Sequence, residues 1–154
     1  MASNSEFLRA VQAALPGLDL RRVKYRTFGR SAEMANILVP LIASGQKTGT
    51  FALAAEFESD PQAAPQVGDL YVVTWFDGTP ALLYRITEIE TVPFNAINER
   101  HVQVEGPNAR DVAIWRSIHW PYFGSWLRER GREPSEDMPV IFQRFELLYV
   151  APRA

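Results

Sequence analysis

The sequence predicts an α+β fold, in which a small curled sheet or barrel of about five or six mostly antiparallel strands is flanked by helices. Two β-rich runs, residues 70–76 and 80–89, surround Asp77-Gly78, which is a strong hairpin signal. The run from Val140 to Val150 ends the chain with further strand-forming residues. Helical periodicity recurs in the segments between these strands, which is typical of the α+β class.

Length and composition fit one globular domain. The 154 residues can bury a sizeable core, and no repeat or linker divides them. The absence of cysteine excludes disulfides and thiolate metal sites, and it fits a reducing compartment. We expect a soluble cytoplasmic protein without a membrane partner, because no cationic start precedes an apolar core and no run approaches about 18 apolar residues. The net charge of −2 disfavours tight, non-specific binding of long nucleic acid.

The N-terminal part is expected to contain a helix and a strand. Ser3 or Asn4 can cap a helix that runs to Leu15, where Pro16-Gly17 ends it. Strict alternation over residues 22–28 then predicts a strand. One face of that strand carries three basic residues: Arg22, Lys24 and Arg26. They either protect an edge strand against aggregation, which is the interpretation we favour, or contact phosphates.

Residues 31–53 predict a helix, a sharp corner and a strand. Ser31 can cap the helix, and Gly45 suits the left-handed position just after its end. Pro40 removes one backbone donor inside the helix, so we expect a kink there. β-forming residues from Thr48 to Leu53 begin the next strand. The buried stripe of the helix is expected to consist of Met34, Leu38, Leu41 and Ile42.

The later segments complete the expected elements. A further strand is expected around Thr91 to Phe94, and Asn95 can cap a short helix through His101 to Val104. Asp111 to Arg130 predicts the longest helix, which Pro121 should break or bend. One side of this helix carries the apolar residues expected to face the core: Ile114, Ile118 and Phe123.

Lys47 and Thr50 form the first candidate site, at the corner between helix and strand. A lysine that loses its proton on burial can take the hydroxyl proton of a threonine and make it a nucleophile. The simpler alternative is a solvent-exposed Gly-x-Lys-Thr sequence without chemistry. The segment is not a P-loop, because the leading glycine is missing and a helix precedes the lysine.

His101 and Glu105 form the second candidate, because residues four apart share one face of a helix. They are either a hydrogen-bonded pair at a helix end, or Glu105 carries a proton in a cleft. With two histidines and no cysteine, a metal site would need carboxylates from elsewhere in the chain. We therefore expect no metal ligands and no cofactor.

The segment from Trp115 to Phe123 is dense in large rings interleaved with arginine and histidine. Such rings can stack on a nucleobase, or they can form core. We expect Trp115 and Phe123 to be core, whereas Trp120 and Tyr122, beside the proline, are candidates for a cleft wall.

Several motifs together resemble the ASCH domain family in order and spacing, from about Phe28 to Val150. The matching segments are Gly45 to Thr50, the Gly68-Asp69 turn, Glu105-Gly106, Trp115 to His119 with Tyr122-Phe123, and Val140 to Tyr149. The resemblance implies that residues 1–154 are one ASCH domain, with a core of about 28–150 and an N-terminal helix-and-strand extension over 1–27. It also implies a PUA-like β-barrel flanked by helices, whose central cleft is associated with RNA or nucleoside ligands.

Within this family, a smaller bacterial enzyme hydrolyses the amide of N4-acetylcytidine with a lysine base, a threonine nucleophile and a glutamate proton donor. Its Gly-x-Lys-x-x-Thr motif matches Lys47 and Thr50, and its His-x-x-x-Glu motif matches His101 and Glu105. The N-terminal helix and the aromatic segment of residues 115–123 place this chain in the longer bacterial branch. Some members of that branch are described as metal-assisted ribonucleases.

The resemblance therefore implies a protein that acts on or binds RNA or a modified nucleoside, and the leading hypothesis is an amidohydrolase with Lys47, Thr50 and Glu105 as catalytic residues. Arg85 or Tyr84 would hold the base or the oxyanion. A ribonuclease would instead need a divalent metal at Glu105, and a non-catalytic RNA-binding module would use the cleft only to hold a base. None of these reads DNA sequence. The other residues expected to bind substrate are Arg22, Lys24, Arg26, His119, Trp120 and Tyr122.

Overall fold

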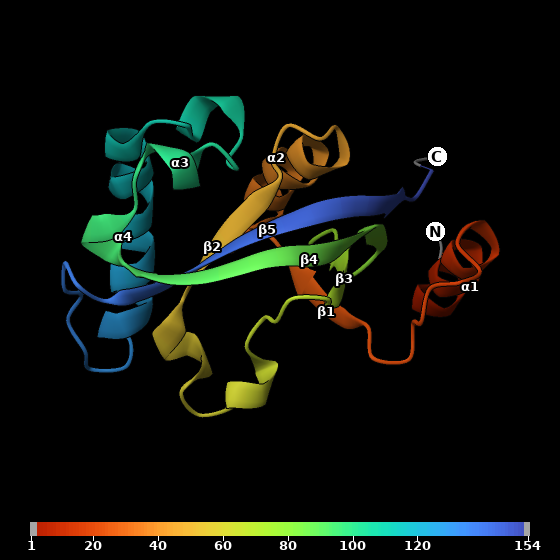
Figure 1. Cartoon of the computed structure of the whole chain (residues 1–154), viewed down its shortest axis with the longest axis horizontal. Coiled ribbons are helices and arrows are strands. Elements are labelled where there is room, and N and C mark those ends of the chain that lie inside the picture. Colours follow the sequence, from red (N-terminus) through yellow and green to blue (C-terminus); the bar gives the residue numbers. More distant parts are fainter. Residues whose placement is uncertain (1–2, 153–154) are drawn as a thin grey trace.

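A computed structural model describes residues 3–152, which form one curled sheet surrounded by helices (Figure 1). Within these residues the sheet has five strands: β1 (Lys24–Thr27), β2 (Gly49–Leu53), β3 (Leu70–Thr74), β4 (Pro80–Pro93) and β5 (Pro139–Val150). Their order across the sheet is β1-β3-β4-β5-β2. The predicted α+β class with a small, mostly antiparallel sheet is confirmed.

Helices lie at both ends of the long central strands (Figure 1). The α-helices of the described chain are α1 (Asn4–Ala14), α2 (Ala32–Ala43), α3 (Glu99–Val102) and α4 (Val112–Arg128). Short 3₁₀ helices are η1 (Ala54–Phe57), η2 (Pro61–Ala63), η3 (Phe94–Ala96) and η4 (Pro107–Ala109). Ser3 caps α1 as predicted, because its Oγ accepts a hydrogen bond from the Glu6 N–H at 3.1 Å.

β4 and β5 form the centre of the sheet, where they pair antiparallel from Leu82–Val150 to Pro93–Pro139. β3 pairs antiparallel with β4, and β2 pairs antiparallel with β5. β1 pairs parallel with β3, so β1 and β2 are the two edge strands. The further strand expected around residues 91–94 is wrong, because β4 continues without interruption to Pro93.

The hairpin between β3 and β4 is confirmed at Asp77-Gly78. The Trp75 N–H donates to the Thr79 carbonyl at 2.8 Å, and the Gly78 N–H donates to the Trp75 carbonyl at 2.9 Å. Gly78 has a φ of +90°, a conformation that favours glycine. The strand predicted from Val140 to Val150 is also confirmed as β5.

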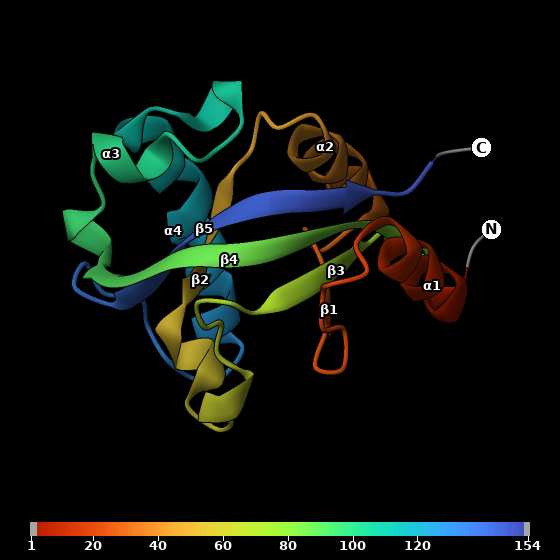
Figure 2. The same ribbon diagram turned by 45° about the vertical axis from the view of Figure 1, so that its right-hand side comes forward.

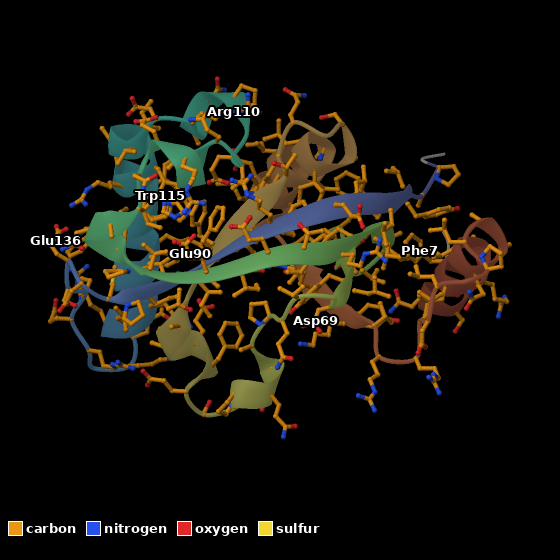
Figure 3. All side chains as sticks on the ribbon, in the orientation of Figure 1. Phe7, Asp69, Glu90, Arg110, Trp115 and Glu136 are labelled. Carbon is orange, nitrogen blue, oxygen red and sulfur yellow. The ribbon has the colours of Figure 1, made fainter. Side chains whose placement is uncertain are left out.

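Among residues 3–152, three apolar cores hold the helices on the sheet. The inner core lies between the sheet and α2 and includes Phe28, Val39, Ile42, Tyr84 and Phe145. The α4 core joins Trp115 and Phe123 to Phe51 and Phe142 on the opposite face of β2 and β5. The α1 core packs Phe7 and Val11 on Leu70, Val72 and Leu83. Figure 3 shows Trp115 between α4 and the strands, and Phe7 pointing from α1 towards the sheet. Figure 2 shows α1 beside the end of β3 and β4, far from α4.

Helix α2 begins where predicted but buries a different stripe. Ser31 Oγ accepts a hydrogen bond from the Met34 N–H at 3.1 Å, so the cap is confirmed. Met34 itself is 44% exposed, and the buried residues are Ala35, Val39 and Ile42. The predicted stripe is therefore partly wrong, because the helix is rotated so that small Ala35 faces the sheet.

Both prolines inside helices are tolerated. Pro40 and Pro121 are exposed, and α2 and α4 continue past them, so the expected break at Pro121 does not occur. The carbonyl that loses its partner lies on the solvent side, where water can bind it. The predicted buried side of α4 is wrong for Ile114 and Ile118, which are exposed, whereas Phe123 is buried as predicted.

The segment before Glu105 differs from its prediction. Asn98, not Asn95, caps the short helix α3, because its Oδ1 accepts a hydrogen bond from the Arg100 N–H at 2.9 Å. Asn95 lies in η3 instead, where its N–H donates to the Glu136 carbonyl at 2.8 Å. α3 has room for one turn only and ends at Val102.

Candidate functional site

The corner between α2 and β2 carries Lys47. Gly45 ends α2 with a φ of +81°, as its position predicts. The Lys47 N–H donates to the Leu41 carbonyl at 2.9 Å, and the Thr48 N–H donates to the Val104 carbonyl at 2.8 Å. Backbone hydrogen bonds therefore hold the corner against the turn that follows α3.

Arg110 ties the same two segments together from outside (Figure 3). Its Nε donates to the Glu105 carbonyl at 2.8 Å, and one terminal nitrogen donates to the Gln46 carbonyl at 2.6 Å. Gly49 allows β2 to approach closely, because a Cβ at that position would lie 2.2 Å from the Gln143 carbonyl oxygen. Glu105 is thus brought beside Lys47 although 58 residues separate them.

Lys47 and Glu105 form a buried ion pair, in which Lys47 Nζ donates to Glu105 Oε1. Only 4% of the lysine side chain and 10% of the glutamate side chain are exposed. The Phe28 ring centroid lies 5.9 Å from Nζ, so one side of the ammonium faces apolar surface. Removing two charges from water is unfavourable unless they pair well, and breaking such a pair is more unfavourable still.

His119 lies against the second oxygen of Glu105, with Nε2 at 3.8 Å from Oε2. Its Nδ1 is 3.0 Å from the Trp115 carbonyl, which can only accept, so Nδ1 carries the proton of the neutral ring. The ring stacks on Trp115 with centroids 4.3 Å apart. Burial lowers the pKa of His119, although Glu105 and the Trp115 carbonyl act in the opposite direction. At neutral pH, His119 is therefore neutral and presents a lone pair to Glu105.

Thr50 is buried on β2, directly opposite Gln143 on β5. Within residues 3–152, no hydrogen bond joins its hydroxyl to Lys47, Glu105 or any other group. The structure therefore brings two of the three predicted catalytic residues into contact, with the third close along the chain and its hydroxyl free.

Tyr84 and Arg85 lie on opposite faces of β4. Tyr84 is fully buried in the inner core, stacked on Phe145 with centroids 4.0 Å apart. Arg85 points the other way, where it forms a partly exposed ion pair with Glu146. Because neighbouring residues of a strand project to opposite sides, Tyr84 lies on the inner side of the sheet and Arg85 on the other, and a substrate-binding role for either stays a prediction.

The basic face of β1 does not form an exposed rail. Arg22 lies before the strand and is exposed. Lys24 pairs with Asp69 at 2.8 Å, and the Arg26 guanidinium lies 4.0 Å from the Phe28 ring centroid. β1 is an edge strand, as favoured above, but Lys24 and Arg26 are half-buried because they are on its inward side.

The core residues predicted in the aromatic segment of residues 115–123 are confirmed. Trp115 and Phe123 are buried in the α4 core. Trp120 is partly buried against Phe94, with centroids 5.3 Å apart, and its place in a cleft wall stays a prediction. Tyr122 is exposed, and the Arg30 guanidinium lies 4.3 Å from its ring centroid.

His101 is not a partner of Glu105. The two do not share a helical face, because α3 ends at Val102. His101 Nδ1 accepts a hydrogen bond from the Asn98 N–H at 3.1 Å, and its Nε2 lies 3.5 Å from Glu90 Oε1. His101 therefore stabilises the start of α3, and the prediction of a shared face is wrong.

Two surface pockets lie away from the ion pair. One of about 520 Å³ lies between η1 and the end of α4, and one of about 940 Å³ lies between α2 and the β3–β4 hairpin. Neither is lined by Lys47, Thr50 or Glu105. The pair itself keeps only a small exposed fraction, 4% for the Lys47 side chain and 10% for the Glu105 side chain.

Neither a metal-binding cluster of side chains nor a membrane-spanning helix is found in residues 3–152. No group of three or more histidine, cysteine, aspartate or glutamate residues there could hold a metal ion. In the same residues, no helix combines the length and the apolar character needed to cross a bilayer.

The sequence reasoning missed three residues around the site: Phe28, Arg110 and Gln143. Arg110 acts through backbone carbonyls, which no side-chain motif reveals. Gln143 does leave a signal, since it is an uncharged polar residue inside an apolar strand run.

Most of the chain is similar to known proteins. Residues 24–149 match the family model described as ASCH domain. The fold is similar to that of an ASCH domain from Lactobacillus crispatus, with 27% sequence identity, a TM-score of 0.82 and coverage of 93% of this chain and 92% of that chain. Protein EF3133 from Enterococcus faecalis is similar at 25% identity and a TM-score of 0.83, with 96% and 94% covered. No curated protein matches the sequence.

Proposed function

Because the chain belongs to the ASCH domain family, as its motifs predict, we propose that it hydrolyses the amide of an N-acylated nucleoside such as N4-acetylcytidine. Lys47 acts as base, Thr50 as nucleophile and Glu105 as proton donor. The observation that carries this proposal is the buried, hydrogen-bonded pair of Lys47 and Glu105. An amine and a carboxyl group are the base and the acid that such a reaction needs.

One proton transfer within the pair prepares both groups. When a proton moves from Lys47 Nζ to Glu105 Oε1, an ammonium and a carboxylate become an amine and a carboxylic acid. Both products are neutral, so burial favours this transfer more than water would. The amine can then accept a proton while the acid can donate one.

The first half of the reaction transfers the acyl group to the protein. Lys47 accepts the Thr50 hydroxyl proton while Thr50 Oγ1 bonds to the acyl carbon. The carbon–nitrogen bond then breaks, and Glu105 gives its proton to the departing amine nitrogen. The products are the deacylated nucleoside and an acyl ester on Thr50, with the pair again an ammonium and a carboxylate.

The second half returns the protein to its starting state. Glu105 accepts a proton from water as the water oxygen attacks the acyl carbon. Lys47 returns a proton to Thr50 Oγ1 as the ester bond breaks. A carboxylic acid is released, and the pair is again an amine and a carboxylic acid.

His119 supports the acid form of Glu105. Because its ring is neutral, His119 places no second positive charge beside Glu105 Oε2, 3.8 Å away, so the acid form with its proton on Oε1 is disfavoured less than it would be beside an imidazolium. A divalent ion bound at Glu105, as a ribonuclease would need, would instead lie beside the Lys47 ammonium. The contacts of Glu105 therefore favour proton transfer over metal binding.

The test compares two substrates with and without a chelator. We expect the purified protein to convert N4-acetylcytidine to cytidine and acetate at a rate that the chelator does not change, and to leave single-stranded RNA intact. Chelator-sensitive cleavage of RNA without deacetylation would replace the proposal with a ribonuclease. Binding of either ligand without turnover would favour a binding module.

A further inference from the structure

Gln143 is a buried polar residue that the mechanism above does not use. Its side chain is 1% exposed in β5, and neither its amide oxygen nor its amide nitrogen has a hydrogen-bond partner among the described residues. A buried polar group without a partner destabilises a protein, because it has lost its hydrogen bonds to water and gained none in return. Such groups are few in native proteins, so an amide with both ends unpaired suggests a partner outside the chain.

The Gln143 amide projects from the same face of the sheet as Thr50. Gln143 lies directly opposite Thr50 on β2 and Ile89 on β4. Residues opposite each other in adjacent strands share a face, with Cβ atoms about 5 Å apart. Phe142, next along β5, faces the α4 core, whereas Phe145 faces the inner core. Gln143 and Thr50 therefore both face inwards.

A second unpaired polar group lies on the inward side of the sheet. Arg26 Nε is buried and has no hydrogen-bond partner among the described residues. Both Arg26 and Lys47 lie near the Phe28 ring, with centroid distances of 4.0 Å to the guanidinium and 5.9 Å to Nζ. The residues after β1 and the residues before β2 thus lie close together at the Phe28 ring. The inward side combines the reactive pair with polar groups that the chain does not satisfy.

We propose that Gln143 determines specificity by pairing with the donor–acceptor edge of the N-acylated base, an inference that rests on the proposed function. A glutamine amide presents an acceptor and a donor side by side. The 4-amide N–H and the ring N3 of an N4-acylated cytosine present the complementary pair. Gln143 Oε1 accepts from N4–H, and Nε2 donates to N3.

This pairing puts the scissile bond beside the nucleophile. The acyl carbon is bonded to N4, the nitrogen that Gln143 holds. Thr50 lies opposite Gln143 across one strand spacing, so its hydroxyl can reach a carbon one bond away from that nitrogen. The same contact orients the substrate for attack and selects a base with an N–H at this position.

Two matched glutamine substitutions test the proposal. Gln143→Met removes the unpaired amide and keeps its length. Gln12→Met makes the same change where the amide is satisfied, since Gln12 Nε2 donates to the carbonyls of Leu15, Pro16 and Leu18 at 3.1, 3.3 and 2.9 Å. The Gln143→Met protein should melt at the same or a higher temperature than the parent, and the Gln12→Met protein should melt lower.

Calorimetric titration with two nucleosides measures recognition without chemistry. Cytidine has the 4-amino group, and the ribonucleoside of pyrimidin-2-one lacks it. The parent and Gln12→Met proteins should bind cytidine at least about fivefold more tightly than the analogue, and Gln143→Met should lose this preference. A preference retained by Gln143→Met, a lower melting temperature of that variant with unchanged cytidine binding, or no nucleoside binding by the parent would each overturn the inference.

The outcomes also separate this inference from the proposed function. Nucleoside selection that depends on Gln143, in a parent that does not release acetate from N4-acetylcytidine, would support the role of Gln143 and contradict the hydrolase. Acetate release with equal nucleoside preference in parent and Gln143→Met would support the hydrolase and contradict the role of Gln143.

Discussion

Two lysine–carboxylate pairs at opposite edges of the sheet differ in burial and in how well they are satisfied. Lys24 and Asp69 beside β1 are 31% and 23% exposed, whereas Lys47 and Glu105 beside β2 are 4% and 10% exposed. Lys24 Nζ also donates to the Ala64 carbonyl, and Asp69 also accepts from the Gln66 N–H. The Lys24–Asp69 pair therefore fastens the loop before β3 to the edge of the sheet.

The Lys47 ammonium has a single hydrogen bond within residues 3–152, to Glu105, although it carries three donors. A pair that is buried and has few hydrogen bonds contributes little net stability. A proton transfer that neutralises both groups therefore costs it less free energy than the same transfer costs a partly exposed pair. The same two chemical groups thus serve structure at β1 and are suited to chemistry at β2.

The two pairs should differ most in the stability that is lost when each carboxylate is changed to its amide. Glu105→Gln leaves a buried, uncompensated ammonium and should lower the free energy of unfolding by about 3–5 kcal/mol. Asp69→Asn should lower it by about 1 kcal/mol or less, because the partly exposed pair is screened by solvent. Urea denaturation of both variants checks this, and equal losses would contradict the distinction between the pairs.

A double substitution separates the net value of the buried pair from the penalty of breaking it. Lys47→Met with Glu105→Leu removes both charges, and it should recover most of the stability lost in Glu105→Gln. It should also abolish turnover. If the double variant is as unstable in urea as Glu105→Gln, the pair is needed for the fold and the argument for a chemical role weakens.

A smaller effect is expected from His119 as the pH falls. Burial lowers the pKa of His119 below its ordinary value of 6.5, so the unfolded chain binds the proton more readily than the folded one. The stability associated with neutral His119 is therefore complete above about pH 6.5 and decreases as the pH falls below it. The unfolding free energy of His119→Gln, followed from about pH 7.5 to 5, should fall less steeply than that of the parent. Parallel curves would show that His119 is not held neutral.

The smallest effect is expected at Arg85. Its ion pair with Glu146 is partly exposed and lies on the face away from Lys47. Arg85→Met should change the free energy of unfolding by no more than about 1 kcal/mol, and turnover should stay within error of the parent. A large loss of turnover with normal stability would support Arg85 as a substrate-binding residue.

The sequence predicts those parts of the site that local rules determine. Gly45 ends α2 and β2 follows, so the position of Lys47 at a corner could be predicted from neighbouring residues alone. Asn95 and Asn98 are equally good N-caps by local rules, and the hydrogen bond from the Asn95 N–H to the Glu136 carbonyl decides between them. When two residues fit the same local role, a contact with a distant part of the chain decides which of them takes it.

The contacts of the site itself depend on distant parts of the chain. Glu105 meets Lys47 because backbone hydrogen bonds join Thr48 to Val104 and Arg110 bridges both segments. Strand alternation predicts that Tyr84 and Arg85 face opposite sides, but only the pairing of β4 with β3 and β5 decides which side is inside. Motif resemblance could name Lys47, Thr50 and Glu105, whereas it could not reveal the unpaired amide of Gln143.

The most direct test of the central claim changes each lysine to arginine and measures deacetylation of N4-acetylcytidine. Arginine keeps the positive charge and stays protonated, so Lys47→Arg separates base function from charge. We predict that Lys47→Arg lowers the rate by roughly 10²- to 10⁴-fold with the fold preserved, and that Lys24→Arg stays within a few-fold of the parent. Turnover by Lys47→Arg close to that of the parent would eliminate Lys47 as the base.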